Sequence, residues 1–185
     1  MLFRSVSYDP TELVITARCG TPLSELAETL DAARQMLPCE PPRFGDGATV
    51  GGMIASGLSG PRRPWSGSVR DFVLGTRVIT GHGKHLRFGG EVMKNVAGYD
   101  LSRLMAGSFG ALGVITEVSL KVLPKPRQTL SISLEMDSDH ALQRLAQWGQ
   151  QPLPISAACH DGQDRKRGVE GKSEGSVRRL VITIK

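Results

Sequence analysis

The chain has 185 residues, of which 39% are hydrophobic, 5% are aromatic and 22 are glycine. This length allows one ordinary domain, or most of one with the start of a second, and the composition excludes both a disordered chain and a large aromatic core. The many glycines predict tight turns and close backbone approaches, as in a loop-rich ligand-binding α+β domain.

The balance of charge makes the chain basic, with 23 lysines and arginines against 18 aspartates and glutamates and a pI near 9.4. Such a balance allows anionic ligands or nucleic acid as partners. The basic residues, however, form short clusters at 61–64, 164–168 and 177–180 with no interleaved aromatic residue that could stack on bases. We therefore favour a solvated surface and expect no nucleic-acid partner.

The cysteines predict a reducing, cytoplasmic setting, because Cys19, Cys39 and Cys159 are odd in number, far apart and outside any CxxC pair. The four histidines show no metal-ligand spacing with them, so we expect no metal site. No apolar run approaches the roughly 20 residues of a membrane helix. Any membrane contact is therefore expected to be indirect, through a partner.

The first elements in chain order are a strand over 11–18 and an amphipathic helix that runs to about Arg34. Thr21 is predicted to be the N-cap of this helix, with Pro22 at its first position. A long stretch rich in proline and glycine follows over 37–67. Long structured loops in compact domains often bind ligands.

A β-hairpin is predicted next, with strands over 72–80 and 85–88 joined by the GHGK turn. A short helix capped by Asp100 then precedes a strand over 114–123. Between them lies GSFGALG, whose glycines have a GxxGxxG spacing. A dinucleotide-binding loop leaves a strand and opens a helix. Here the order is reversed, so the motif is weak evidence for a Rossmann unit.

A second domain is expected after Pro124 and Pro126, because a strand over 129–136, a helix from Ser138 and a strand over 153–159 make a β-α-β pattern. The remaining residues are almost free of apolar side chains until the closing LVITIK, a predicted strand with no evident sheet to join. The predicted division is therefore a domain over 1–126, the start of another over 127–160, and a divergent, poorly ordered tail over 161–185.

The strongest local signal for ligand binding is GDGATVGGMIASG, over 45–57. Thr49 is predicted to cap a short helix whose first turn contains Gly51 and Gly52, so that backbone N–H groups are accessible to a phosphate. Equally, these glycines could only let the helix pack tightly against a strand. Both interpretations stay open at this point.

Other candidate sites are weaker. Gly67 permits a close backbone approach, and Arg70 with Asp71 could pair or hold a ligand, although an exposed pair of this kind is usually surface decoration. No serine lies in a GxSxG motif, and no cysteine or histidine has a nucleophile context. We assign no catalytic residue.

Three stretches in this order resemble the FAD-binding PCMH-type flavoproteins, and within them the subunits of bacterial glycolate oxidases. They are ATVGGMIASG (48–57), SGSVRDFVLGTRVITGHGKHLRFGG (66–90) and KNVAGYDLSRLMAGSFGALGVITEVSLKVLPKP (94–126). The likeness extends from about Tyr8 to His160. It implies an α+β fold in which FAD lies extended between two subdomains, with an α+β cap domain over the isoalloxazine.

The resemblance also implies cofactor-binding roles for particular residues. Thr49, Gly51 and Gly52 would face the pyrophosphate. Ser56, Gly57 and Gly67 would line the flavin side, with Arg70 as a further cofactor-binding candidate. Gly113, Val114 and Ile115 would contact the adenosine half. The redox chemistry itself belongs to the flavin.

The implied function is that of an FAD-dependent oxidoreductase subunit, in a complex that oxidises glycolate, a small 2-hydroxy acid, to glyoxylate. The implied partners are a sister flavin subunit and an iron–sulfur subunit, in the cytoplasm or peripheral to the inner membrane through those partners. A structural or interaction subunit that has lost the cofactor is the alternative.

Departures from the family pattern refine this expectation. Family members begin with a further subdomain carrying a pyrophosphate loop, and the likeness fades after His160, so the chain is expected to be shortened at both ends and to bind FAD weakly. Catalytic relatives tend to carry a basic residue at the position of Met93 and a hydroxyl at that of Ala97. A missing cation would leave a substrate carboxylate without its charge-assisted partner, which favours an accessory flavin subunit.

Overall fold

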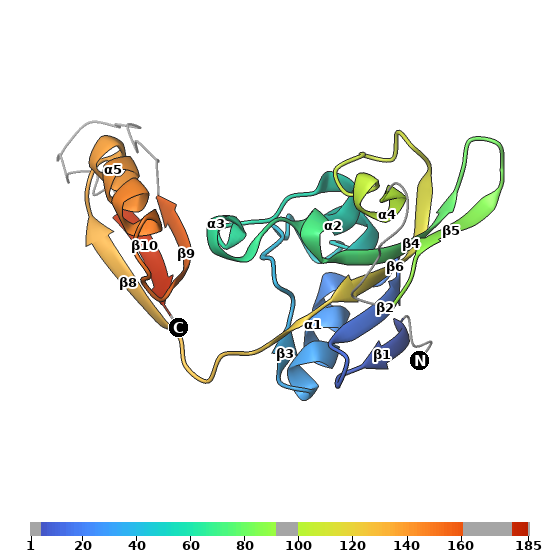
Figure 1. Cartoon of the computed structure of the whole chain (residues 1–185), viewed down its shortest axis with the longest axis horizontal. Coiled ribbons are helices and arrows are strands. Elements are labelled where there is room, and N and C mark those ends of the chain that lie inside the picture. The colour runs from blue at the N-terminus through green and yellow to red at the C-terminus, as the bar shows by residue number, and fades with distance from the viewer. Residues whose placement is uncertain (1–4, 92–99, 161–178, 185) are drawn as a thin grey trace, which may run out of the picture. The chain divides into compact units, whose positions relative to one another are not determined.

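The computed structural model describes residues 5–91, 100–160 and 179–184. The chain forms two compact units, Met1–Lys125 (unit 1) and Pro126–Lys185 (unit 2), and each is described by itself. Figure 1 labels their helices and strands. Met93 and Ala97, on which the expected departures in the KNVAGYD loop depend, lie outside the described residues.

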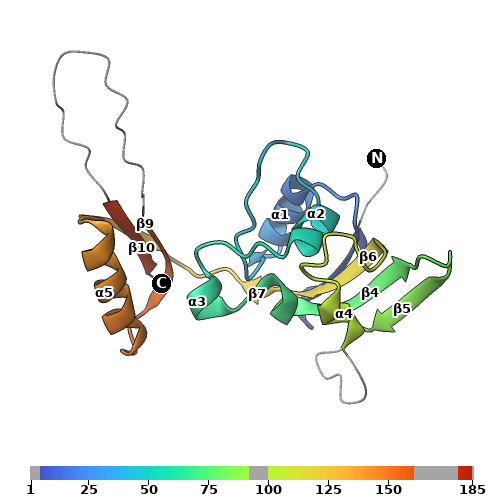
Figure 2. The same cartoon turned by 90° about the horizontal axis from the view of Figure 1, so that it is seen from above.

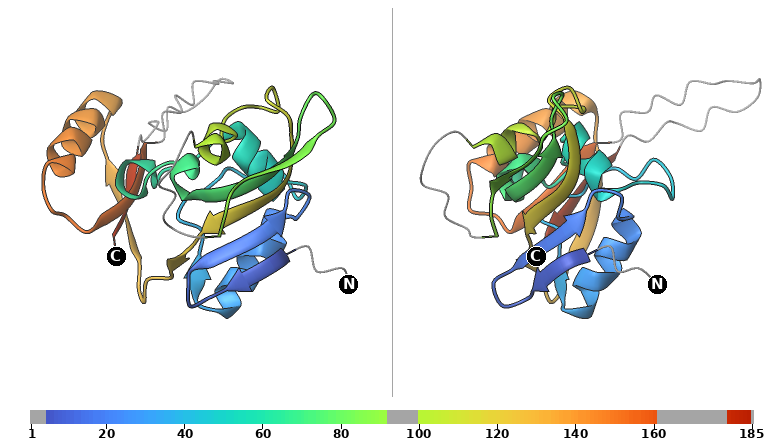
Figure 3. Two further views of the ribbon diagram at one scale, coloured as in Figure 1. Left: turned by 45° about the vertical axis from the view of Figure 1, so that its right-hand side comes forward. Right: turned by 90° about the vertical axis from the view of Figure 1, so that its right-hand side faces the viewer.

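A five-stranded sheet forms the frame of unit 1, and each of its strand pairs is antiparallel. Its strands in spatial order are β1 (Ser5–Asp9), β2 (Val14–Arg18), β6 (Val114–Lys121), β4 (Val73–Ile79) and β5 (His85–Gly89). The long β4–β5 hairpin is plain in Figure 3 and confirms the predicted hairpin. The β-branched residues of these strands suit a sheet with one buried face.

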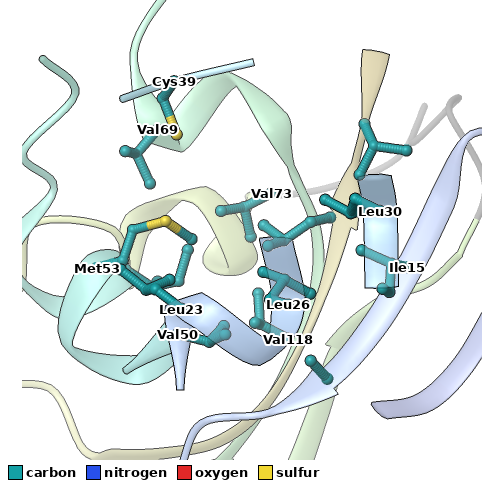
Figure 4. Packing of buried hydrophobic residues seen from close by; sticks show 14 residues of the cluster. Ile15, Leu23, Leu26, Leu30, Cys39, Val50, Met53, Val69, Val73 and Val118 are labelled. Atoms are coloured by element: carbon teal, nitrogen blue, oxygen red, sulfur yellow. The ribbon is translucent and has the colours of Figure 1, made fainter. Parts of the chain in front are cut away.

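Two helices, α1 (Leu23–Ala32) and α2 (Val50–Ser56), cover one face of this sheet, as Figure 2 shows. The predicted apolar stripe of α1 is confirmed, because its leucines at 23, 26 and 30 are buried. Figure 4 shows them packed against residues of β2, β4, β6 and α2 in one hydrophobic core. Burying such side chains contributes roughly 1.5–3 kcal/mol each.

The predicted start of α1 is wrong by one residue. Pro22, not Thr21, occupies the N-cap, with an extended backbone (φ −60°, ψ 141°) that forms a β-bridge with Thr49. The Thr21 carbonyl accepts a hydrogen bond from the N–H of Val50. This stretch therefore ties the beginnings of α1 and α2 together.

Short elements complete unit 1. They are β3 (Gln35–Met36), paired with β7 (Leu123–Pro124), and the helical turns α3 (Arg63–Ser66), η1 (Val69–Phe72) and α4 (Leu101–Leu104). The Asp100 carboxylate accepts a hydrogen bond from the N–H of Arg103 at 3.0 Å. This contact confirms the predicted cap at Asp100.

Unit 2 is a three-stranded antiparallel sheet with one helix, α5 (Ser138–Gly149), packed on one face. Its strands in spatial order are β8 (Leu130–Glu135), β10 (Arg179–Ile184) and β9 (Ile155–His160). The expectation that the closing strand has no sheet to join is wrong, because β10 is the central strand and pairs with both neighbours. The sequence between 161 and 178 lies outside the described residues.

The stability of α5 is expected to depend on pH, because an aspartate, Asp137, is its N-cap. Hydrogen bonds from the backbone and side chain of His140 lower the pKa of the Asp137 carboxyl to about 2. Because this pKa lies below the ordinary value of an aspartate, the ionised carboxylate stabilises the folded helix. This stabilisation is present above about pH 4 and is lost as the pH falls toward 2. We expect the helical circular-dichroism signal to fall over this range, and Asp137→Asn to flatten that fall. Superimposable pH profiles of the two proteins would contradict this role for Asp137.

Candidate functional site

Helix α2 begins as the sequence predicts, with Thr49 as its N-cap, but its first N–H groups all donate to protein acceptors. The hydrogen bonds join Val50 to the Thr21 carbonyl at 2.9 Å, Gly51 to the Cys19 carbonyl at 2.8 Å and Gly52 to Thr49 Oγ1 at 3.1 Å. These are the donors that a phosphate at a helix start would use. A phosphate near α2 would therefore depend on other groups.

Gly51 is required for close packing. A Cβ at this position would lie 2.7 Å from Cys19 Cβ and 3.0 Å from the Cys19 carbonyl oxygen. The Cys19 thiol is itself largely buried, which raises its pKa to about 12, with a further contribution from Glu117. For Gly51 the structure thus favours tight packing of α2 against the end of β2 over contact with a pyrophosphate.

A groove of about 350 Å³ lies between residues of α2 and the segment over 41–48, and we call it the α2 groove. Three of the predicted cofactor residues, Thr49, Gly52 and Ser56, line it together. Its other lining residues are mostly apolar or small: Leu23, Pro41, Pro42, Phe44, Gly45, Gly47, Ala48, Met53 and Leu58. Mostly apolar walls with a few polar groups are typical of small-molecule sites.

Sequence reasoning missed Phe44, Met53 and Leu58 in this groove. Met53 belongs to MIAS (53–56), a short apolar piece that interrupts the loop, and Leu58 follows it after Gly57, whereas Phe44 is a lone aromatic residue between Arg43 and Gly45. An isolated apolar residue in a turn-rich segment has no periodic partner in sequence. Its position beside α2 follows only from the way the loop over 41–48 folds back.

The GSFGALG stretch docks onto the carbonyl end of α2. The N–H of Gly107 donates to the Ile54 carbonyl, and that of Phe109 to the Ala55 carbonyl, both at 2.9 Å. Gly57 ends the helix at φ +66°, and a Cβ there would lie 3.0 Å from the Cα of Gly107. The stretch leaves α4 and enters β6, so the predicted helix-to-strand order is confirmed and its first part caps α2.

The residues predicted to contact adenosine lie where this stretch enters β6. Gly113 has φ +148°, and a Cβ there would lie 2.7 Å from both the Ile79 carbonyl oxygen and Val78 Cγ1. Val114 is 64% exposed, whereas Ile115 packs against the main core. Gly113 is half-buried, so the surface that a ligand could contact here is mainly the exposed Val114, and the adenosine role stays a prediction.

Gly67 and Arg70 lie in a separate turn around η1 and do not line the α2 groove. The Asp71 carboxylate accepts hydrogen bonds from the N–H and the hydroxyl of Ser68, each at 2.8 Å. These bonds lower the pKa of the Asp71 carboxyl. Asp71 is therefore a turn-capping residue, and Arg70 is exposed beside it.

A second hollow, of about 480 Å³, lies between α1 and the segment over 35–43. It shares Leu23 and Pro41 with the α2 groove. An ion pair between Arg62 and Glu40, with 2.8 Å between Nε and Oε1, and another between Lys125 and Asp31 lie among its lining residues. Its charges are therefore largely matched within the protein.

Comparison with known proteins identifies a matching domain and similar proteins. A model described as an FAD binding domain matches residues 1–89. The Escherichia coli (strain K12) protein named glycolate oxidase subunit GlcE is 65% identical over 173 residues, which cover 94% of this chain and 49% of that protein. The Bacillus subtilis glycolate oxidase subunit GlcD is 34% identical over 140 residues, 75% of this chain and 29% of that protein.

Two further matches are less similar in sequence. A D-lactate dehydrogenase from Archaeoglobus fulgidus is 32% identical over 156 residues, 83% of this chain and 34% of that enzyme. A solved structure of alkyldihydroxyacetonephosphate synthase superposes with a TM-score of 0.74 at 20% identity, over 97% of this chain and 36% of that one. The fold is therefore the PCMH-type α+β fold.

The chain spans about half the length of the GlcE protein that it matches, and less of the others. Within the described ranges, no helix is long and apolar enough to cross a membrane. The expected resemblance is confirmed by the domain match and by the identity to GlcE. Residues 1–89 of this chain therefore match the FAD binding domain, and the chain is similar to the PCMH-type flavoproteins, among them glycolate oxidase subunit GlcE.

Proposed function

We propose that this chain is the FAD-binding subunit of a glycolate oxidase complex, which oxidises glycolate or a similar 2-hydroxy acid to the 2-oxo acid. The observation that carries the proposal is the 65% identity to the GlcE subunit over 94% of the chain. At this identity we expect the relative's cofactor and complex to be shared. The same identity favours a flavin subunit over a cofactor-free interaction subunit.

The α2 groove supports the proposal because its residues fit part of a dinucleotide. The Thr49 hydroxyl accepts a hydrogen bond from Gly52, so its own proton can be donated to a phosphate or ribityl oxygen. The Ser56 hydroxyl donates to the Met53 carbonyl at 3.2 Å and can accept from a ligand. A groove of about 350 Å³ is at the small end for ligand sites, so it would take one part of FAD and not the whole.

FAD, when bound, supplies the two-electron redox chemistry, and the protein supplies binding and orientation. We assign the hydroxyls of Thr49 and Ser56 and the open surface of Gly52 to cofactor contact. The segment over 113–115 would contact the adenosine half. Gly57 and Gly113 hold the backbone turns that place these surfaces, and no catalytic residue is assigned on this chain.

The remaining proposals concern the assembly. A GlcD-like flavin subunit and an iron–sulfur subunit would be the partners, and the complex would be cytoplasmic or peripheral to the inner membrane through them. Residues 127–160, together with β10, would belong to a cap domain. Turnover of the hydroxy acid would take place mainly in the partner flavin subunit.

Flavin loading tests the proposal. The chain, purified alone and after co-expression with a GlcD-like partner, is expected to carry the absorbance bands of bound FAD and to unfold at a higher temperature with added FAD. At 100 times the dissociation constant, the gain in the free energy of unfolding is about 2.7 kcal/mol. A colourless protein with no thermal shift in either preparation would contradict cofactor binding. Recovery of a colourless complex with the partner would indicate the cofactor-free alternative.

A further inference from the structure

Phe44 is the most exposed of the large hydrophobic side chains in the described ranges, at 88%, although it lines the α2 groove. Of the described residues that line this groove, it alone carries an aromatic ring. We propose that Phe44 stacks on a planar heteroaromatic ring of FAD bound in the α2 groove. This inference rests on the proposed function and extends it to a residue that binds the ring.

The walls of the groove are in place before any ligand binds. Leu23 and Met53 are 2% and 4% exposed and belong to the main core, so they form a packed floor. Thr49, Gly52 and Ser56 belong to α2 or its cap. A planar ring that enters the groove therefore meets a rigid apolar floor on one side, and its other side needs a cover from the loop over 41–48.

The backbone around Phe44 allows that cover. The segment over 42–47 is exposed throughout, and a Cβ at Gly45 or Gly47 would meet no atom within 4 Å. Gly45 has φ +153°, and its carbonyl accepts one hydrogen bond from Ala48 at 3.3 Å. The Phe44 side chain, at 88% exposure, is not covered by its neighbours, and the glycines at 45 and 47 allow the local backbone rotation that would bring its ring onto a ligand.

Stacking gives a reason for an exposed phenyl ring at this position. Covering an apolar face of a ring that was in water lowers the free energy of the complex, and an aromatic pair adds further stabilisation beyond that from the buried area. Isoalloxazine and adenine both have flat faces that suit a phenyl ring. Phe44 could therefore stack on either ring of FAD. Ligands that contain only isoalloxazine or only adenine can show which ring it contacts.

The test uses the whole chain with Phe44→Leu, which keeps apolar bulk without the ring, and Phe44→Tyr, which keeps the ring. FAD affinity is expected to fall about two- to tenfold in Phe44→Leu and about five- to hundredfold in Phe44→Ala. Phe44→Tyr should bind within about twofold of the wild type. Leu86→Ala, on β5 and outside the groove, is the matched surface control and should bind FAD as the wild type does.

Binding of FMN, which contains only isoalloxazine, and of ADP, which contains only adenine, shows which ring of FAD contacts Phe44. A loss of affinity for FMN in Phe44→Leu, with ADP affinity unchanged, assigns the contact to isoalloxazine, whereas a loss for ADP alone assigns it to adenine. Unchanged FAD affinity in Phe44→Leu, equal losses for FMN and ADP, or a Phe44→Tyr protein as weak as Phe44→Leu would each overturn the stacking contact and leave FAD binding intact. A wild-type chain that binds none of the three ligands would overturn the proposed function as well.

Discussion

Gly60→Ala is expected to lower the free energy of unfolding of unit 1 by about 3 kcal/mol or more. Gly60 has φ +73°, and a Cβ there would lie 2.1 Å from the Glu40 carbonyl oxygen and 2.9 Å from its carbon. Both contacts are with backbone, so no side-chain rotation relieves them. The N–H of Glu40 also donates to the Ser59 carbonyl at 3.1 Å, which fixes the two segments together.

The measurement is urea unfolding followed by circular dichroism, with Gly47→Ala as the control. Gly47 lies in the same stretch, but a Cβ there would meet no atom within 4 Å, and its φ is not in the left-handed region. We expect this control to be neutral or slightly stabilising, since alanine restricts the unfolded chain. Equal unfolding midpoints for the two variants would contradict the close contact between Gly60 and Glu40.

The same substitution should weaken FAD binding. Glu40 precedes Pro41 and Pro42, which line the α2 groove. Displacement of the Glu40 carbonyl would shift this wall of the groove even in molecules that remain folded. FAD affinity measured well below the unfolding transition is expected to fall in Gly60→Ala and to stay unchanged in Leu86→Ala, the surface control outside the groove.

Leu180→Ala should destabilise unit 2 by about 2–5 kcal/mol, the usual range for a fully buried leucine. Leu180 is 0% exposed, in the central strand, and among the described residues its packed cluster has two other buried members, Ala141 and Ile182. Removing one of three such residues takes away a large share of a small core. The total stability of a domain is commonly only about 5–15 kcal/mol, so we expect unit 2 to unfold substantially.

Hydrogen exchange read by mass spectrometry can resolve this effect by segment. Peptides from β8, β9 and α5 should exchange much faster in Leu180→Ala, while those from β2, β4 and β6 keep their protection. Leu130→Ala is the control, because Leu130 is 58% exposed on the edge strand β8 and should change little. Unchanged protection of β9 in Leu180→Ala would contradict the central position of β10.

Local signals in the sequence predicted most elements of both units. Alternating apolar residues indicated β6 and β8, and the leucine stripe indicated α1. The caps at Thr49 and Asp100 were predictable because a capping side chain bonds within three residues of itself. Such interactions need no knowledge of the rest of the fold.

Features that depend on contacts distant in sequence could not be predicted in this way. The place of β10 follows from pairing with β8, whose residues lie about fifty positions earlier, as in the pair of Leu180 with Leu134. For Gly51, sequence left phosphate contact and tight packing equally open, and the choice depends on how close Cys19 lies. Phe44 belongs to the groove only because the chain turns back toward α2.

The strand order of unit 2 has a consequence for its synthesis. β8 and β9 do not pair with each other, since β10 lies between them. β8, α5 and β9 therefore leave the ribosome before the strand that joins them has been made, whereas the sheet of unit 1 is complete once residue 121 has emerged. Because domains generally fold as units during translation, unit 1 can fold on the nascent chain, and unit 2 must wait for residues 179–184.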